Sequence, residues 1–431
     1  MRLLTAGSAE ATAFLAHLQE RARLPDPEVQ AAVSAILEDV RQRGDSALFE
    51  YTQKFDGIRL DGKTIRVPAA EVEAAAASLD PAVHGALALA ASRIEAFHRR
   101  QHRESWFYEE DGVGLLGQLV RPLARVGLYV PGGSAAYPST VLMNAIPARV
   151  AGVEDLLICT PPGRDGRVSA AVLAAAQLLG IREIYRVGGA QAVAALAFGT
   201  ESIRPVDKIA GPGNIYVATA KRMVFGVVGI DMLAGPSEVL IVADETAAAP
   251  WLAADLLAQA EHDRRASALL VTPSAPLAEA VREEVGRQLA DLPRAGLAAE
   301  ALEHFGAAIL VPDLSAAVAL ANVIAPEHLE LMVADPWALV PQVRNAGAVF
   351  LGAHTPEAAG DYLAGPNHVL PTAGTARFSS PLSVEDFQKR CSLLSLHPGT
   401  LRRWEEPITR LARLEGLEAH ARSVTIRTKQ P

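Results

Sequence analysis

The chain has 431 residues, of which 50% are hydrophobic and 21% charged, so it can bury the cores of two or three domains and is neither disordered nor one small domain. Its formal net charge of −9 gives no general attraction to nucleic acids or anionic membranes, and we expect neither as a partner. Two cysteines are too few for a disulfide scaffold or a thiolate-rich metal site, whereas the 11 histidines leave nitrogen and oxygen ligands for a transition metal.

The N-terminus carries no recognisable targeting signal, because Glu10 interrupts it before an apolar stretch can form, and we expect a cytoplasmic protein. Residues 126–148 are uncharged and long enough to cross a bilayer. Pro131, Pro138 and Pro147 would break a single helix there. We therefore predict a strand, a glycine-rich loop and a buried helix in this segment, and no membrane span.

A mainly helical portion comes first. Asp26 is the predicted N-cap of a helix that ends at Gly44, and Asp80 caps another that runs to about His102. On the second helix, His98 and His102 have the i, i+4 spacing of metal ligands. Because arginines surround them and disfavour another cation, we predict a solvated helix face instead.

The segment Gly-Val-Gly-Leu-Leu-Gly at 112–117 matches the dinucleotide-binding fingerprint. That motif needs a strand before it and a helix after it. Here an aromatic and acidic segment precedes it, and an extended segment containing Pro122 follows. We predict a glycine-rich turn between two strands.

Short β-branched runs then alternate with Ala/Leu-rich stretches in two series, a pattern typical of parallel sheets covered by helices. The first series has predicted strands at 125–130, 155–160, 183–187 and 207–210, and helices at 139–151, 169–179, 191–198 and 214–225. The second has strands at 239–243, 268–272, 307–311 and 346–351, and helices at 248–262, 276–289 and 314–324. We expect two related α/β domains.

The tail after residue 383 is predicted to be helical at 400–417 and to end in a strand-like piece at 423–427. It has little apolar surface to bury by itself. We expect it to pack on the main body or on a second subunit.

Four glycine-containing loops follow predicted strands, at 130–134, 187–191, 211–214 and 235–238. In open parallel sheets ligands bind beyond the carboxyl ends of the strands, and glycine permits close approach to the backbone. The four loops together predict a binding crevice.

Several polar residues are ambiguous by themselves. Gln259 and His262 end an apolar helix face, where spacing alone favours a polar helix end. Glu327 and His328 are a pair suited to proton transfer, or an ordinary helix start after Pro326.

Three further polar residues have an equally plain interpretation. Asp361, after Gly360, could belong to a turn. Glu415 and His420 could be exposed residues near a helix end.

Over about residues 21–423, the order and spacing of seven motifs closely resemble the histidinol dehydrogenase family. They are Val-Gly-Leu-Tyr-Val-Pro-Gly-Gly at 126–133, Val-Gly-Gly-Ala-Gln-Ala at 187–192, Gly-Pro-Gly-Asn at 211–214, Ala-Gly-Pro-Ser-Glu at 234–238, Gln-Ala-Glu-His at 259–262, Ala-Pro-Glu-His-Leu-Glu at 325–330 and Asn-His-Val-Leu-Pro-Thr at 367–372.

The resemblance implies that zinc is held by Gln259, His262, Asp361 and His420, the last supplied across a homodimer interface. These ligands leave the ion with a net positive charge, which suits the neutral amine and imidazole of L-histidinol. The resemblance also implies that zinc mainly orients the substrate.

The implied activity is the last step of histidine biosynthesis, the oxidation of L-histidinol through an aldehyde to L-histidine with two NAD. His328 matches the general base for the alcohol, and Glu327 the residue that activates water for hydration of the aldehyde. The remaining matched residues are the substrate contacts Ser237, Gln259, His262, His328, Asp361, Glu415 and His420, and the NAD contacts Tyr129, Gln191 and Asn214.

The implied fold is α/β, with two large incomplete Rossmann-like domains, one inserted in the other, and small helical terminal segments. The expected boundaries are an N-terminal segment 1–25, a main domain 26–129 and 238–382 carrying the zinc and catalytic residues, an inserted NAD-binding domain 130–237, and a tail 383–431 that completes the partner subunit's site.

Two alternatives remain. A related NAD- and zinc-dependent dehydrogenase could act on another small alcohol such as a sulfonated diol, although Glu415 would repel a sulfonate. A non-catalytic zinc-binding or nucleotide-binding protein could also use this fold, although the presence of both Glu327 and His328 opposes it.

Overall fold

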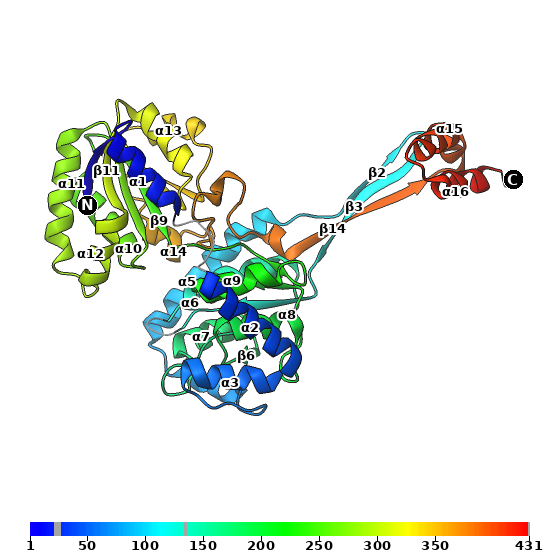
Figure 1. Cartoon of the computed structure of the whole chain (residues 1–431), viewed down its shortest axis with the longest axis horizontal. Coiled ribbons are helices and arrows are strands. Elements are labelled where there is room, and N and C mark those ends of the chain that lie inside the picture. The colour runs from blue at the N-terminus through cyan, green and yellow to red at the C-terminus, as the bar shows by residue number, and fades with distance from the viewer. Residues whose placement is uncertain (21–26, 133–135, 430–431) are drawn as a thin grey trace.

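Figure 1 shows two α/β bodies and a long projecting arm. The structure, a computed structural model, describes residues 1–20, 27–132 and 136–429. The predicted N-cap Asp26 and the loop residues Gly133 and Ser134 lie outside the described residues. The predicted α/β class is confirmed.

The first body is built on a five-stranded parallel sheet. Its strand order is β6 (Glu183–Tyr185), β5 (Asp155–Cys159), β4 (Arg125–Tyr129), β7 (Lys208–Ala210) and β8 (Gly229–Ile230). The helices that follow its strands are α6 (Pro138–Ala151), α7 (Ala170–Leu178), α8 (Gly189–Phe198) and α9 (Ile215–Val224). Side chains alternate along each strand, so α6 and α7 pack on one face and α8 and α9 on the other.

The second body contains a six-stranded parallel sheet. Its order is β1 (Arg2–Thr5), β11 (Gly306–Leu310), β10 (Ser267–Thr272), β9 (Glu238–Ala243), β12 (His328–Met332) and β13 (Ala348–Leu351). One face packs on α10 (Ala249–Ala260), α11 (Ala275–Leu289) and α12 (Ala295–Phe305), and the other on α1 (Ala9–Glu20) and α13 (Leu314–Ile324).

The two sheets share one topology. Numbered from the first strand of each series, both have the doubly wound order 3-2-1-4-5, and β1 adds an edge strand to the larger sheet. The expected pair of related α/β domains is therefore confirmed at the level of strand order.

Sheet membership differs from the expected domain boundaries at the N-terminal side. Residues 2–5 pair with β11, and the helix α2 (Pro27–Arg43) packs on α8 and α9 of the five-stranded sheet. Local sequence patterns identify a helix but do not tell which sheet it covers. We propose that 1–20 and 238–366 form one domain, and 27–102, 125–235 and 367–387 the other.

The remaining helices of the first body complete its surface. They are α3 (Asp45–Asp56), α4 (Ala69–Ala77), α5 (Pro81–His98) and the 3₁₀ turns η1 (Arg99–Gln101) and η5 (Val384–Phe387). In the second body, the short elements are η2 (Pro336–Ala338), η3 (Val340–Gln342) and α14 (Glu357–Tyr362), while η4 (Thr375–Arg377) belongs to the segment 367–387 of the first body. Among the described residues no single helix is long and apolar enough to span a membrane; only the pair Ala69–Ala77 and Pro81–Gln101, bent by 110°, meets that criterion together.

The solvated-face prediction was wrong for His98, which is fully buried. Its Nδ1 donates to the Ile94 carbonyl (2.8 Å), since a carbonyl only accepts, and its Nε2 lies 3.3 Å from the Asn367 amide nitrogen. The helix α5 packs against α6, which places this face inside. His98 is thus a hydrogen-bonded core histidine, while His102 is exposed.

The arm is an antiparallel sheet in the order β14 (Gln388–Leu396), β3 (Gly114–Pro122) and β2 (Trp106–Glu110). The helices α15 (Pro398–Leu414) and α16 (Glu418–Thr428) lie at its far end (Figure 1). The fingerprint at 112–117 forms the turn and start of the β2–β3 hairpin, as predicted. The strand predicted at 423–427 was wrong, because these residues pack as a helix against α15.

Candidate active site and metal centre

Most of the predicted catalytic and metal residues meet at the amino edge of the six-stranded sheet. His328 is the first residue of β12 and pairs in register with Val239 of β9. Ala325 ends α13 with φ 53 and turns the chain directly into this strand, so Glu327 precedes a strand and not a helix. Gln259 is in the last turn of α10, which runs back along the sheet to the same edge.

His328 is buried and its tautomer follows from its contacts. The Nδ1 atom lies 3.0 Å from the Glu238 carbonyl, which can only accept, so Nδ1 carries the proton. Within the described residues Nε2 has no hydrogen-bond partner and lies 4.0 Å from a carboxylate oxygen of Asp361. Burial lowers the pKa of His328 to about 4. The side chain is therefore a neutral imidazole with a free lone pair, as a general base requires.

Glu327 is also buried, beside the imidazole. Its Oε2 accepts from the Glu238 backbone N–H (2.9 Å) and lies 3.7 Å from Nδ1 of His328. Burial raises the pKa of Glu327 well above its usual value, although hydrogen bonds from Glu238 and from the half-buried Ser237 oppose the shift. This carboxyl can hold or release a proton within reach of a substrate beside His328.

Gln259 is completely buried, and its partners assign the orientation of its carboxamide. The nitrogen donates to the Glu238 carbonyl (3.2 Å) and to both carboxylate oxygens of Glu357 (3.1 and 3.2 Å). The amide oxygen therefore lies on the opposite branch, away from Glu357.

His262, Glu357 and Asp361 each offer one ligand atom, and these atoms lie within 4.8 Å of one another. An imidazole and carboxylates suit zinc, which is commonly held by nitrogen and oxygen ligands. Burial raises the pKa of Asp361 to about 6, and a bound cation would favour its ionised form. The residues present therefore fit a metal ion of this class.

Sequence reasoning missed two residues of this group. Glu357 lies four residues before Asp361 on α14, a spacing that places both on one helix face. His368 donates from Nδ1 to the Asp361 carbonyl (3.1 Å), and burial lowers its pKa to about 4. The helical spacing could have identified Glu357, but no local pattern indicated a role for His368.

The predicted NAD contacts lie at the carboxyl edge of the five-stranded sheet. Tyr129 ends β4, and its hydroxyl accepts from the Gly189 N–H (3.0 Å). Gln191 is buried in the first turn of α8, and its Oε1 has no partner among the described residues. Asn214 is exposed and caps α9. The strands β4 and β7 are adjacent here, so this is the topological switch point where open α/β sheets bind ligands.

Three of the four predicted loops, at 130–134, 187–191 and 211–214, follow β4, β6 and β7 and lie at that edge as far as they are described. The fourth, at 235–238, instead leads into β9 at the amino edge of the other sheet. The four loops predicted to form a single crevice are thus divided between the edges of two sheets.

The segment 367–373 ties these edges together. The Asn367 side chain donates to the Met143 carbonyl of α6 (2.6 Å), and the Thr372 hydroxyl accepts from the Gly235 N–H (2.6 Å). His368 lies between these two anchors. The metal residues and the nucleotide-type loops therefore belong to one interdomain region.

The last two predicted site residues are not brought to this region within one chain. Glu415 and His420 are exposed, at and near the ends of α15 and α16, which Figure 1 places at the far end of the arm.

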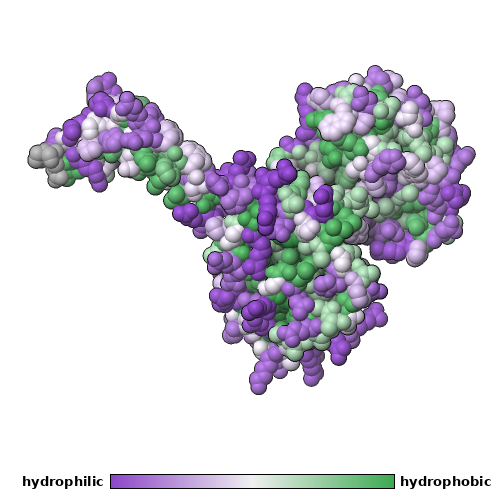
Figure 2. Space-filling view, turned by 180° about the vertical axis from the view of Figure 1, so that it is seen from behind, coloured by the Kyte–Doolittle hydropathy of each residue, from purple (hydrophilic) through white to green (hydrophobic). Residues whose placement is uncertain are grey.

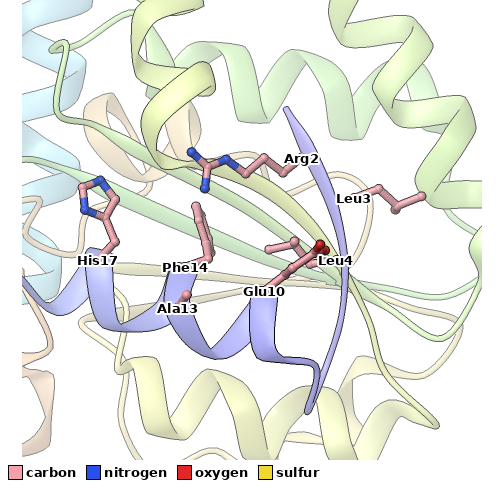
Figure 3. Close-up of a pocket in the computed structure, with 7 residues that line it drawn as sticks. All are labelled: Arg2, Leu3, Leu4, Glu10, Ala13, Phe14 and His17. Carbon is pink, nitrogen blue, oxygen red and sulfur yellow. The ribbon is translucent and has the colours of Figure 1, made fainter.

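A separate surface hollow lies between β1 and α1 (Figure 3). It is lined by Arg2, Leu3, Leu4, Glu10, Ala13, Phe14 and His17. Three strands, β11, β10 and β9, separate its edge strand from β12. None of the predicted site residues lies there.

Comparisons with known proteins agree with the motif pattern. The family model described as histidinol dehydrogenase matches residues 19–428. The histidinol dehydrogenase of Syntrophotalea carbinolica is 55% identical over 429 residues, covering 100% of this chain and 99% of that one. The histidinol dehydrogenase of Rhizobium meliloti is 59% identical over 401 residues, which cover 93% of this chain and 92% of that one. The crystal structure of histidinol dehydrogenase from Elizabethkingia anophelis superposes on this structure with a TM-score of 0.93 at 38% sequence identity. The superposition covers 100% of this chain and 98% of that one.

Proposed function

The chain belongs to the histidinol dehydrogenase family, so it is an NAD-dependent oxidoreductase of the final step of histidine biosynthesis, and we propose that the interdomain site performs both oxidations. In the first, the alcohol of L-histidinol loses a hydride to NAD and a proton to the protein. In the second, the hydrated aldehyde loses a hydride to a second NAD and two protons to the protein and solvent, and becomes the carboxylate of L-histidine. The relatives give no support to the alternatives of a sulfonated diol or a non-catalytic role.

The observation that carries the proposal is the free lone pair on Nε2 of His328. It is buried, it belongs to a neutral imidazole, and it lies 4.0 Å from Asp361, a proposed metal ligand. A base in this position can take the proton of an alcohol held at the metal site. The Nδ1–H bond to the Glu238 carbonyl keeps the ring in the required tautomer throughout.

Glu327 is the proposed acid–base group of the second step. It must be ionised to take a proton from the water that attacks the aldehyde, and positive charge nearby favours that form. The Glu238 N–H and the Ser237 hydroxyl, which contact its carboxylate, also favour ionisation. Ser237 is in addition a proposed substrate contact.

We propose that zinc is held by Gln259, His262 and Asp361 of one chain and by the partner subunit's His420, one ion per subunit. When bound there, zinc supplies the positive charge that orients the amine and imidazole of L-histidinol. The support is the cluster that contains His262 and Asp361, together with the amide oxygen of the buried Gln259, which is turned away from Glu357.

The proposed NAD contacts are Tyr129, Gln191 and Asn214. The support is their position at the switch point of the five-stranded sheet, next to loops whose glycines leave the backbone open. The buried Oε1 of Gln191, without a partner among the described residues, offers an acceptor for a ligand donor.

We propose a homodimer in which the arm of each chain reaches the partner's site. Glu415 and His420 are too remote to act within their own chain, and an arm of one antiparallel sheet has no second layer to cover it. Side chains on it are strongly exposed, including Phe107 (64%), Leu394 (67%) and Leu414 (83%). Figure 2 shows hydrophobic patches among the polar residues of the arm, as expected where a partner covers part of its surface.

The function is tested by following NADH after L-histidinol is added to zinc-loaded protein with NAD. We expect NADH formation, its loss after treatment with a chelator, and its recovery when zinc is restored. Absence of NADH from zinc-loaded protein, or an unchanged rate after zinc removal, would refute the proposed zinc-dependent reaction.

A further inference from the structure

The buried contact between Gln259 and Glu357 joins the two helices that carry the proposed metal ligands. Gln259 lies three residues before His262, and Glu357 lies four residues before Asp361. Both carboxylate oxygens of Glu357, at 3.1 and 3.2 Å, face the same amide nitrogen, and the Glu238 carbonyl accepts from it at 3.2 Å. Three acceptors thus surround one donor group.

This arrangement decides which end of the carboxamide is free. An amide nitrogen has donors and no lone pair for a metal, whereas the amide oxygen has two lone pairs. Because the nitrogen is held by the three acceptors, the planar group must turn its oxygen to the other side. In this orientation the amide oxygen, which makes none of these three contacts, is left free to act as a metal ligand.

We propose that Glu357 is a positioning residue, which orients the Gln259 carboxamide so that its oxygen faces the metal and which explains why position 259 carries an amide and not a carboxylate. This inference rests on the zinc site of the proposed function. A glutamate at position 259 would set its own oxygen against the oxygens of Glu357 and Glu238 without a donor between them. Groups behind the ligands of a metal are known to orient them in this way.

The competing role for Glu357 is direct coordination, since its carboxylate is one of the three groups within 4.8 Å. The two roles differ in what an exchange of the two side chains would do. If Glu357 orients Gln259, exchanging amide and carboxylate restores a donor–acceptor pair and leaves an oxygen for the metal. If Glu357 is itself a ligand, the exchange does not restore the lost ligand.

The experiment compares zinc affinity among the parent, Glu357→Gln, Gln259→Glu and the double variant, by competition with a fluorescent zinc chelator. We expect each single variant to bind zinc about 10- to 100-fold more weakly, the range for groups that orient metal ligands. In Glu357→Gln, the amide at position 259 loses the carboxylate that orients it. In Gln259→Glu, the carboxylate oxygens at position 259 face the oxygens of Glu357 and Glu238 without a donor between them. We expect the double variant to regain most of the lost zinc affinity. Its net charge equals that of the parent.

Glu245→Gln is the matched control, because it removes the same charge from an exposed position; we expect its zinc affinity to be unchanged. Glu357→Asp keeps the charge but withdraws the acceptor oxygens, and we expect weaker binding from it as well, so the test does not depend on one variant folding. Thermal melting of every variant verifies the fold.

Parental affinity in Glu357→Gln, or a double variant as weak as the weaker single variant, would overturn the positioning role while the zinc site itself stands. A parent protein that does not compete with the chelator for zinc at all would instead overturn the zinc site, and the positioning role with it.

Discussion

At the scale of single residues, burial sets the chemistry of the site. His328 is kept neutral because burial lowers its pKa to about 4, and the Glu238 carbonyl fixes the proton on Nδ1. Burial also raises the pKa of Glu327, and groups whose pKa values are shifted in this way are suited to proton transfer near neutral pH.

His328→Asn keeps a polar side chain but removes the Nε2 lone pair. We expect kcat for alcohol oxidation to fall by about 10²- to 10⁴-fold, the usual contribution of a positioned general base, with zinc affinity little changed because His328 is not a proposed ligand. Steady-state rates together with zinc competition measure both. A variant that oxidises L-histidinol at the parental rate would remove His328 from the mechanism.

The burial of Glu330 leads to a prediction about how the stability of the fold depends on pH. It is buried on β12, and burial together with the charge of Asp255 raises its pKa from 4.5 to about 8. The folded state therefore keeps a proton that the unfolded state releases, so stability is lost as pH rises from about 4.5 to about 8, by up to about 1.4 kcal/mol per pH unit.

Glu330→Gln mimics the protonated side chain and removes this titration. Compared with the parent, we expect a higher melting temperature at pH 9 and a much smaller difference at pH 5, measured by thermal denaturation across that range. An equal difference at both pH values would show that Glu330 does not titrate in this window.

The sequence predicted the roles of some site residues but not of others. Glu327 and His328 stood out because an adjacent acid and imidazole suit proton transfer, whereas the spacing of Gln259 favoured only a polar helix end. Glu357 was not predicted, although its spacing of four residues from Asp361 on α14 could have indicated it; only its contact with Gln259, which joins α10 and α14, is absent from any local pattern. His98 was misjudged for a similar reason, because packing against α6 outweighed the surrounding arginines.

At the scale of elements, buried polar groups fix the loops that approach the ligands. Lys221 on α9 and Asp231 after β8 form a buried ion pair. The Asp231 carboxylate accepts from the Gly211 N–H (2.7 Å), and the Lys221 ammonium donates to the Gly211 carbonyl (2.8 Å). Gly211 has φ +119, and an added Cβ would lie 2.1 Å from the Tyr129 carbonyl oxygen. The ion pair thus holds the start of the loop that carries Asn214.

Asp231→Asn should loosen this loop while leaving the other sheet intact. We expect KM for NAD to rise by roughly tenfold, equivalent to ~1.4 kcal/mol of binding free energy, and KM for L-histidinol to change little. The histidinol KM of the same variant is the internal control. Equal increases in both constants would argue against a specific role of the ion pair at the NAD loop.

Most elements of the two β/α series were predictable, because buried parallel strands are apolar runs that alternate with Ala/Leu-rich helices. The helix α12 and the strands β1, β8 and β12 were not predicted, and the strand β14 lies in a tail that was expected to be helical. The prediction of a strand at 423–427 was wrong. The β-branched residues there favour a strand by local propensity, but packing against α15 makes the segment part of the helix α16.

At the scale of the whole molecule, the chain separates the proposed site residues into two places. The interdomain region carries most of them, and the end of the arm carries Glu415 and His420 (Figure 1). The domain boundaries expected from sequence did not match sheet membership near the N-terminus, since the packing of distant segments is a long-range property.

A shared site can be tested with mixed dimers. His262→Ala and His420→Ala should each be inactive alone, but a heterodimer of the two has one site with both residues intact. We expect about half of the parental activity per heterodimer, by the symmetry of a two-site dimer. Continued inactivity in heterodimers verified by two affinity tags would place each complete site within one chain.

The coupling of two oxidations in one site is tested most directly by counting NADH when a limiting, known amount of L-histidinol is consumed to completion with excess NAD. We predict two NADH for each L-histidinol, with L-histidine as the product, from the stoichiometry of the two hydride transfers. One NADH for each L-histidinol, with the aldehyde accumulating in solution, would contradict it.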